Sequence, residues 1–351
     1  MAGSKRLIIG GVDTHSATHH AAVINRNGRL IADAEFPASP AGYASMLTWM
    51  RSQGKLSQVG VEGTGAYGAG LARYLHQQSV EVLEVPRPDR RLRRQRGKSD
   101  PIDAEAAART VLAGKASGVP KLADGPIEAI RMLRIARNGA VKARTAALNT
   151  LRSMVITAAE PLRTQLRSLS SAQLVAACAR LRPDSTNLAD PVQAAKHALR
   201  SIAQRVQHLD IETRSLRTEL DELAQSVAPV TSAIFGLGPD TVSALLVTIG
   251  DNPDRLRSEA AFAHLCGVAP IPASSGKTNR HRLHRGGDRA GNSALHIATV
   301  VRLRYDPRSR AYADRRTTEG LSMPEIIRCQ KRYLAREIFY ALRTDYAKIS
   351  T

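Results

Sequence analysis

The sequence contains few cysteines, few aromatic residues and no long apolar run, and each shortage excludes a class of protein. Its three cysteines, Cys178, Cys266 and Cys329, lie far apart, which fits neither a disulfide framework nor a zinc site. Aromatic residues make up 4% of the chain, so stacking platforms for single-stranded bases are scarce. There is no run of about 18 apolar residues and no signal-peptide layout in the first residues, so we expect a cytoplasmic protein without a membrane span.

Acidic residues are scarce relative to basic ones, since 31 Asp and Glu stand against 51 Lys and Arg, a formal net charge of +20. A surplus this large favours a polyanionic partner, because each phosphate neutralised by Lys or Arg releases condensed counterions. An anionic membrane surface is a weaker alternative, and a basic protein without such a partner is another. The 351 residues, 43% of them hydrophobic, suffice for two or three domains with buried cores.

The first predicted domain, residues 1–118, alternates strand and helix patterns, which is typical of an α/β domain with a mixed sheet. Residues 6–12 and 58–63 are apolar runs that predict buried strands, and residues 19–39 predict a hairpin that turns at Asn27-Gly28. We also expect a strand at 80–85 and helices at 41–53, 67–79 and 100–114.

A helical pattern begins near Pro126, and residues 119–228 are predicted to form a helical, coiled-coil linker and dimerisation region. Within 192–228, apolar residues recur at alternating spacings of four and three, which predicts either a coiled-coil seam or a long antiparallel helical hairpin. The predicted fold class is therefore α/β followed by α. The apolar series consists of Ile202, Val206, Leu209, Leu216, Leu220, Leu223 and Val227.

The third predicted domain, residues 229–351, is helical and opens with an element similar to a helix-hairpin-helix. Gly236 and Gly238 stand between two predicted helices, and Pro239 opens the second of them. Such a turn lets backbone N–H groups meet a DNA phosphate without obstruction by side chains. A plain interhelical turn is the alternative.

Four carboxylates in the first domain are candidates for a metal site. Asp13 and Glu62 each end a predicted strand, so the two side chains can converge above a sheet. Asp100 and Asp103 are three residues apart and share one face if both are helical. Oxygen ligands suit Mg²⁺ or Mn²⁺ rather than zinc, and two such ions can hold the attacking and leaving oxygens of a phosphodiester displacement. Glycines at positions 60, 63 and 65 are expected to keep this edge open to a phosphate.

Each pair of acids also has a plainer interpretation. An aspartate at the end of a strand, such as Asp13, is often a turn residue. Asp100 before Pro101 is typical of a helix N-cap, with Asp103 then at the third helical position, as in a capping box. Residue types alone leave these alternatives open.

The ordered motifs D-T-H at 13–15, V-E-G-T-G at 61–65 and K-S-D-P-I-D-A at 98–104 resemble those of a family of bacterial insertion-sequence recombinases, the DEDD recombinases. That family includes the Piv DNA invertase and the bridge-RNA-guided transposases. The resemblance extends to the middle helices and the C-terminal segment, so it covers nearly the whole chain. It implies an N-terminal domain with the ribonuclease H-like fold of the RuvC resolvase. It further implies metal binding by all four acids, since Asp13, Glu62, Asp100 and Asp103 each fall on a family acid.

The resemblance continues in residues 262–299 and implies a nucleophilic serine there. Ser275 would form a covalent phosphoserine link to DNA, and the adjacent Ser274 is a lesser candidate. A serine hydroxyl is a poor nucleophile until it is activated or its leaving group is stabilised, and without the resemblance Ser275 is an ordinary loop serine. Ala290 departs from a position that is often basic in relatives. The residues that match in order are Gly267, Val268, Pro270, Ser275-Gly276-Lys277 and Gly291-Asn292.

Basic residues gather in three places beside these candidate sites. They are the block 87–98, the loop after Ser275, and the block 302–316. Arginine suits bidentate phosphate contact and the loop cations can neutralise a phosphorane-like transition state, although a charge run can also be a solvated face. His281 and His284 are either proton shuttles or surface histidines. The expected nucleic-acid contacts are Arg90, Arg91, Arg93, Arg94, Arg96, Lys98, Gly236, Gly238, Lys277, Arg280, Arg282 and Arg285.

These expectations combine into a transposase of a mobile insertion sequence that acts on donor and target DNA. We expect a homo-oligomer, a dimer or tetramer, in the bacterial cytoplasm and associated with the nucleoid. No base-reading recognition helix is apparent, which fits target reading by a structured guide RNA, as the resemblance implies. The alternatives are an unguided invertase, a metal-dependent nuclease of the Holliday-junction resolvase type without a covalent step, and a non-enzymatic RNA-binding protein with a decayed site.

Overall fold

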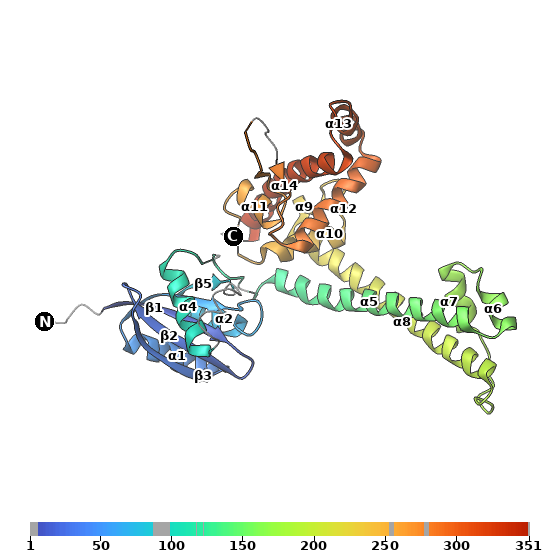
Figure 1. Cartoon of the computed structure of the whole chain (residues 1–351), viewed down its shortest axis with the longest axis horizontal. Helices are drawn as coiled ribbons and strands as arrows, with labels where there is room; N and C mark the ends of the chain where they lie inside the picture. Colours follow the sequence, from blue (N-terminus) through green and yellow to red (C-terminus); the bar gives the residue numbers. More distant parts are fainter. Residues whose placement is uncertain are drawn as a thin grey trace. The chain divides into compact units, whose positions relative to one another are not determined.

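A computed structural model describes the chain in two units (Figure 1). The first unit comprises Met1–Gly125 with Ile249–Arg255, and the second comprises Pro126–Thr248 with Leu256–Thr351. The predicted contacts in the block 87–98, together with Lys277 and Arg280, lie outside the described residues. The residues that the structure describes are 6–86, 99–116, 118–121, 123–252, 256–276 and 281–349.

The first unit is built on a mixed five-stranded sheet with the strand order β3-β2-β1-β4-β5. The central strand β1 (Leu7–Thr14) is antiparallel to β2 (Thr18–Asn25) and parallel to β4 (Lys55–Glu62). At the edges, β3 (Leu30–Pro37) is antiparallel to β2, and β5 (Glu81–Val85) is parallel to β4. The predicted mixed sheet is thus confirmed.

The predicted hairpin between β2 and β3 is also confirmed. Gly28 has a φ of +75°, a conformation that favours glycine at this turn. The Asn25 side-chain oxygen accepts hydrogen bonds from the N–H groups of Asn27 and Arg29, both at 2.9 Å. These bonds close the turn from within and set the register of the two strands.

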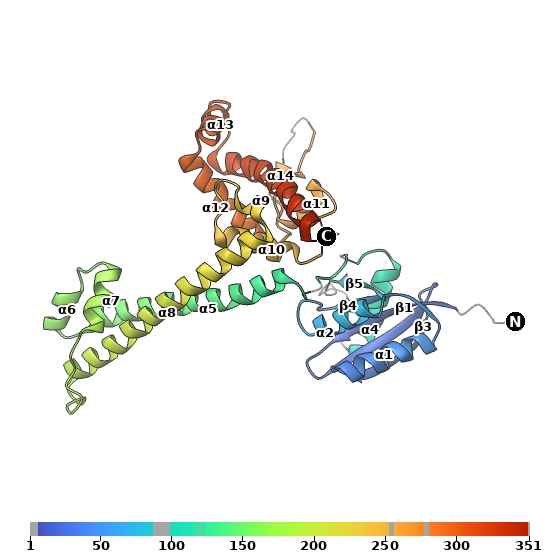
Figure 2. The ribbon, with the colours of Figure 1, turned by 180° about the vertical axis from the view of Figure 1, so that it is seen from behind.

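Helices cover both faces of the sheet (Figure 2). One face packs on α1 (Pro40–Ser52) and α2 (Ala69–Gln77), with Met46 and Leu71 fully buried between them and the strands. The other face packs on α4 (Asp100–Leu112). Because successive strand residues alternate between faces, this division decides which side chains of β1 and β4 meet α4.

Two glycines allow α4 to lie directly on the sheet. A Cβ on Gly11 would stand 2.2 Å from the Ala104 carbonyl oxygen and 2.2 Å from the Ala108 amide nitrogen. A Cβ on Gly60 would stand 2.6 Å from a Val111 methyl group. Gly60 therefore lies under the helix, and the expectation that it keeps the sheet edge open is wrong. Gly65, by contrast, has nothing within 4 Å of its Cβ position.

A long antiparallel helical hairpin opens the second unit, formed by α5 (Pro126–Thr157) and α8 (Pro191–Val227) (Figure 1). Of the two interpretations of the apolar repeat at 192–228, the structure shows the hairpin. Arg144 of α5 pairs with Asp210 of α8 at 2.5 Å, and Val206 and Leu220 of the repeat are buried. At its far end the hairpin packs on α6 (Glu160–Leu166) and α7 (Ser171–Ala179) around a core of their leucines.

The rest of the second unit is helical, as expected, apart from a short two-stranded ribbon. Its helices converge where the Asp345 carboxylate accepts hydrogen bonds from the N–H groups of Val230 and Thr231, both at 2.9 Å. No helix in the described part of the chain is long and apolar enough to cross a membrane. The elements are α9 (Pro229–Ser232), α10 (Pro239–Ile249), α11 (Glu259–Leu265), β6 (Ile271–Pro272), β7 (His281–Arg282), α12 (Arg289–Tyr305), α13 (Pro307–Thr318) and α14 (Met323–Ile349).

Candidate active site

Asp13 and Glu62 lie side by side at the ends of two parallel strands. The register pairs Val12 of β1 with Val61 of β4, so the next residue of each strand falls at the same level. Asp13 is two residues after Gly11, and Glu62 is two residues after Gly60. Because alternate strand residues share a face, both acids lie on the face of the sheet that α4 covers. Asp13 is 6% exposed and Glu62 is 7% exposed, and the Thr14 hydroxyl donates to the Glu62 carbonyl at 2.9 Å.

Asp100 and Asp103 come from the first turns of α4. Gly11 contacts Ala104 and Ala108, so the residues one turn earlier in the helix lie above the end of β1, where Asp13 stands. Asp103 is 4% exposed, whereas the Asp100 side chain is 42% exposed. Of the four predicted acids, the structure groups Asp13 and Asp100 within 4.8 Å, whereas Glu62 and Asp103 lie at the neighbouring strand end and in the first turns of α4 but outside that group.

The capping interpretation of the Asp100–Asp103 pair is wrong. The N-cap of α4 is Ser99, with extended φ and ψ of −148° and 150°, and Asp100 is the first helical residue. The Asp103 N–H donates to the Ser99 carbonyl at 3.1 Å as the first bond of the helix, which puts Asp103 at the fourth helical position. Neither acid therefore occupies its expected place in a capping box.

His15 joins this group, and the sequence analysis missed it. Its Nε2 lies 3.2 Å from an Asp13 carboxylate oxygen and 3.3 Å from an Asp100 carboxylate oxygen. Among the described residues this nitrogen finds no hydrogen bond of acceptable geometry, although it is shielded from solvent. Donor atoms of Asp13, His15 and Asp100 all lie within 4.8 Å of one another, close enough to share one metal ion. A signal was present, since a residue two places after Asp13 shares its face of an extended chain.

The predicted nucleophile Ser275 belongs to the second unit and is exposed. It follows β6, which pairs with β7 through Ile271 with Arg282 and Pro272 with His281. The next residue, Gly276, has a φ of +55°, so the chain turns sharply after the serine. Two of the predicted phosphate contacts, Arg282 and Arg285, are exposed on or beside this ribbon.

Asn292 and Lys331 fix the chain that leads into the ribbon. The Asn292 amide donates to the carbonyls of Cys266 and Gly267, at 2.9 and 3.0 Å. The Lys331 ammonium in turn donates to the Asn292 side-chain oxygen at 2.7 Å, and burial lowers the pKa of this lysine. Asn292 of the Gly291-Asn292 motif therefore fixes the backbone at Cys266 and Gly267, which precedes β6 and Ser275.

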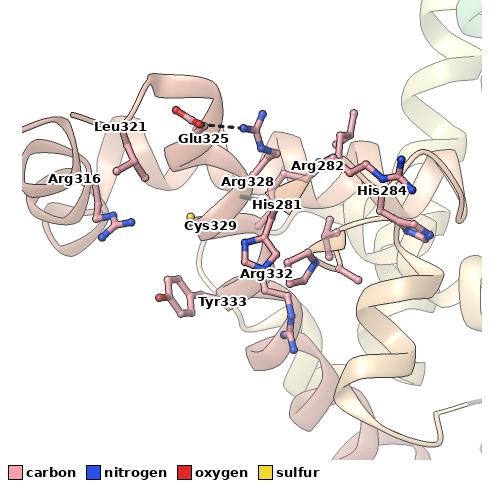
Figure 3. A pocket seen from close by; sticks show the side chains of 16 residues that line it. His281, Arg282, His284, Arg316, Leu321, Glu325, Arg328, Cys329, Arg332 and Tyr333 are labelled. Atoms are coloured by element: carbon pink, nitrogen blue, oxygen red, sulfur yellow. Dashed lines mark ion pairs between the residues drawn. The ribbon is translucent and has the colours of Figure 1, made fainter. Parts of the chain in front are cut away.

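A pocket of about 480 Å³ lies beside the same ribbon (Figure 3). Its lining includes His281 and Arg282 of β7, the nearby His284, and side chains from α13 and α14. Five Lys or Arg side chains line it against a single carboxylate, that of Glu325, while Arg316 and Arg332 also pair with Glu319 and Glu259 outside the lining. Positive charge therefore still exceeds negative charge around the pocket. The five are Arg282, Arg316, Arg328, Lys331 and Arg332.

The glycine turn before α10 is engaged within the protein. Gly236, with a φ of +91°, packs against α12, where its Cβ would stand 3.0 Å from the Ala298 carbonyl oxygen. The Gly238 N–H donates to the Thr241 hydroxyl at 2.8 Å. The helix before the turn, α9, has four residues, so the element is shorter than the expected helix-hairpin-helix. Phosphate contact by Gly236 and Gly238 stays a prediction.

In the basic block 302–316, Arg302 forms bonds within the protein, whereas four other arginines are exposed. Arg302 donates to the Phe235 carbonyl at 2.8 Å and forms two bonds to Glu337, at 2.7 and 2.9 Å. It therefore clamps the glycine turn to α12 and α14. The exposed arginines of the block are Arg304, Arg308, Arg310 and Arg315.

Two segments of the chain match the models of known protein families. A family model described as a transposase matches residues 10–159, which contain all four acids and His15. A second, described as the transposase IS116/IS110/IS902 family, matches residues 229–314, which contain Ser275 and the ribbon. Two segments of the chain are thus similar to transposases of insertion sequences.

Two curated relatives to which the chain is similar also come from insertion elements. An uncharacterized 43.6 kDa protein of insertion element IS110 from Streptomyces coelicolor is 31% identical over 147 residues, 41% of this chain. An uncharacterized 42 kDa protein of insertion element IS900 from Mycobacterium paratuberculosis is 26% identical over 159 residues, 44% of this chain. The matched segments span 36% and 39% of these relatives, so each match covers less than half of the relative's length.

Proposed function

We propose that this protein is a transposase that cuts and rejoins the DNA of an insertion sequence. It would use a set of metal-binding carboxylates and a nucleophilic serine. The observation that carries the proposal is the group of Asp13, His15 and Asp100 within 4.8 Å, with Glu62 at the end of the neighbouring strand β4. Its second support is the pair of transposase-family matches, which together include the acids and Ser275. The net charge of +20 suits a DNA substrate.

The carboxylates are proposed to hold Mg²⁺ or Mn²⁺. Donor atoms of Asp13, His15 and Asp100 lie within 4.8 Å of one another, which is close enough for them to share one ion. The shielded His15 nitrogen between Asp13 and Asp100 also fits a site built for a cation. Asp13, Glu62, Asp100 and Asp103 would bind the ion, with His15 as an added nitrogen ligand. When bound, a divalent ion would stabilise negative charge on the phosphate and on the leaving oxygen.

Ser275 is proposed to attack the scissile phosphorus. Its Oγ forms the new P–O bond while the bond to the leaving DNA oxygen breaks, and the serine proton passes to solvent or a nearby base as the leaving oxygen is protonated. The phosphoserine keeps the energy of the broken bond. A hydroxyl of another strand can then attack it, restoring the serine without ATP. Arg282 and Arg285 are exposed on or just after the same ribbon, and we propose that they neutralise the phosphate during both steps.

The acids and the serine belong to different units of the chain. We propose that the acids of one subunit act with the serine of another in a homo-oligomer. Mixing Asp13→Ala protein with Ser275→Ala protein should then restore strand exchange that each variant lacks. Failure of the mixture to exchange strands, with both variants folded and oligomeric, would exclude a shared site.

We also propose that a structured RNA selects the target. The described residues include no helix with the pattern of a base-reading element, while the protein is strongly basic. A structured noncoding RNA encoded beside the reading frame, retained by the purified protein and required for target choice, is the expected finding. Strand exchange at full rate without RNA would instead identify an unguided invertase.

The decisive experiment traps the covalent intermediate. DNA with both ends of the element is incubated with protein, Mn²⁺ and the neighbouring RNA, and the products are separated on a denaturing gel. Wild-type protein should migrate with attached DNA, Ser275→Ala should give no adduct, and Ser274→Ala should behave as wild type. Cleavage by Ser275→Ala without an adduct would favour a resolvase-type nuclease. Binding without cleavage of any substrate would favour a non-enzymatic RNA-binding protein.

A further inference from the structure

The pocket beside the β6–β7 ribbon shares only Arg282 with the chemistry described above. We propose that it holds one unstacked nucleotide of the DNA strand that Ser275 attacks, with Tyr333 stacking on the base. The inference rests on the proposed function, because that function identifies the bound strand as the DNA that Ser275 attacks. It rests on four separate observations about the pocket: its size, its charge, its aromatic residue and its place on the ribbon.

The size of the pocket suits one nucleotide. Its volume of about 480 Å³ falls in the range of roughly 300–1,000 Å³ that is typical of sites for small molecules. A duplex does not enter a hollow of this size, so a base must leave its stack to occupy it. Enzymes that modify a base accept an extruded base in a closely fitting pocket, so a hollow of this kind can hold one.

The lining offers the two kinds of contact that a nucleotide requires. Arg282 forms no ion pair with any residue that the structure describes, so it is available to a phosphate. Arg328 pairs with Glu325 only weakly, at 3.8 Å. Val268, Pro270 and Leu321 give the same hollow apolar walls, which suit a base rather than an inorganic ion.

Tyr333 supplies an aromatic surface in a chain that has few. It is 58% exposed on α14 and lines the pocket (Figure 3). Tyr312 meets it at 86° with ring centroids 5.8 Å apart, an edge contact that holds the Tyr333 ring without stacking on it. Stacking on such a ring tolerates every base, so the pocket need not read sequence.

The ribbon ties the pocket to the nucleophile. His281 and Arg282 line the pocket, and His281 pairs with Pro272, three residues before Ser275. Three extended residues span at most about 11 Å, and stacked nucleotides along a strand are about 3.4 Å apart. The nucleotide in the pocket therefore lies within about three positions of the phosphate that Ser275 attacks.

The test uses the full-length protein and single-stranded DNA of the element end that carries 2-aminopurine at one of the first four positions beside the cut. Wild type should change the fluorescence at one position only. Tyr333→Ala should remove this change and weaken binding about tenfold, while Tyr333→Phe should preserve both. Tyr340→Ala is the matched control, because Tyr340 is 55% exposed on the same helix and does not line the pocket.

Two results would overturn the proposal. One is equal binding and fluorescence for Tyr333→Ala and Tyr340→Ala. The other is a Tyr333-dependent preference for RNA of the same sequence, which would assign the pocket to a guide strand. The covalent-trapping gel, run on the same variants, separates this question from the proposed function. Absence of an adduct even with wild type refutes the serine mechanism, whereas the fluorescence result tests the pocket directly.

Discussion

The carboxylate site and the serine ribbon place reactive groups in opposite physical settings. Asp13, Glu62 and Asp103 are almost entirely buried, and two strands and a helix hold them in a defined register. Ser275 and Arg282 are exposed; Ser275 follows the two-residue strand β6 and precedes a sharp turn at Gly276, and Arg282 ends the two-residue strand β7. A metal site needs fixed ligands, while a nucleophile that receives DNA needs access, so the contrast matches the two proposed roles.

The two settings also differ in what the reactive groups contribute to the free energy of unfolding. Buried carboxylates destabilise a fold unless a cation or hydrogen bonds offset their charge, whereas an exposed serine contributes little to stability either way. Substitutions of the buried acids in the first unit should therefore change both the activity and the free energy of unfolding. Substitutions at the ribbon should change activity alone.

Asp13→Asn should have the largest effect on activity. Removing one carboxylate ligand should lower DNA cleavage about a thousandfold, because several kcal/mol of charge stabilisation are lost. The melting temperature without metal should stay the same or rise, since one buried negative charge is gone. Initial cleavage rates and thermal unfolding measure both. Asp33→Asn, a carboxylate on β3 that pairs with His20 at 2.8 Å, should cleave normally. A large loss of stability in Asp13→Asn would point to a structural role.

Gly11→Ala should have the largest effect on stability. The new methyl group would overlap the backbone of α4 at 2.2 Å, so the helix must shift, at a cost of about 3 kcal/mol. The first unit should then melt roughly 10 °C lower and bind Mn²⁺ poorly. Gly65→Ala is the control, with open space around its Cβ position, and should melt within about 2 °C of wild type. Equal melting of the two variants would contradict the close packing of α4 on the sheet.

His15→Ala should have the smallest effect and concerns metal preference. A nitrogen ligand favours Mn²⁺ over Mg²⁺, which prefers oxygen, so Mn²⁺ affinity should fall about tenfold and Mg²⁺ affinity less. Pulsed electron paramagnetic resonance on bound Mn²⁺ should show nitrogen coupling in wild type and lose it in the variant. His76→Ala, an exposed histidine on α2, should retain the coupling. Nitrogen coupling that survives in His15→Ala would rule out this ligand.

Local patterns were sufficient for much of the first unit. The apolar runs, the Asn27-Gly28 turn and the acids at strand ends predicted all five strands of the sheet, the hairpin and the places of Asp13 and Glu62. The apolar repeat at 192–228 predicted a long helix but left its partner open. The ribbon β6–β7 was not predicted, because two-residue strands carry no periodic signal.

The sequence by itself determined where the strands of the five-stranded sheet and the long helices lie, because those choices depend on neighbours along the chain. Only the tertiary structure decided that α4 lies on Gly11 and Gly60, that Asp100 therefore faces His15, and that Arg302 clamps a turn. It also brought the side chains of α13 and α14 to the ribbon that leads to Ser275. The physical reason is that these contacts join segments tens of residues apart. Their geometry depends on packing between surfaces, which no local repeat encodes.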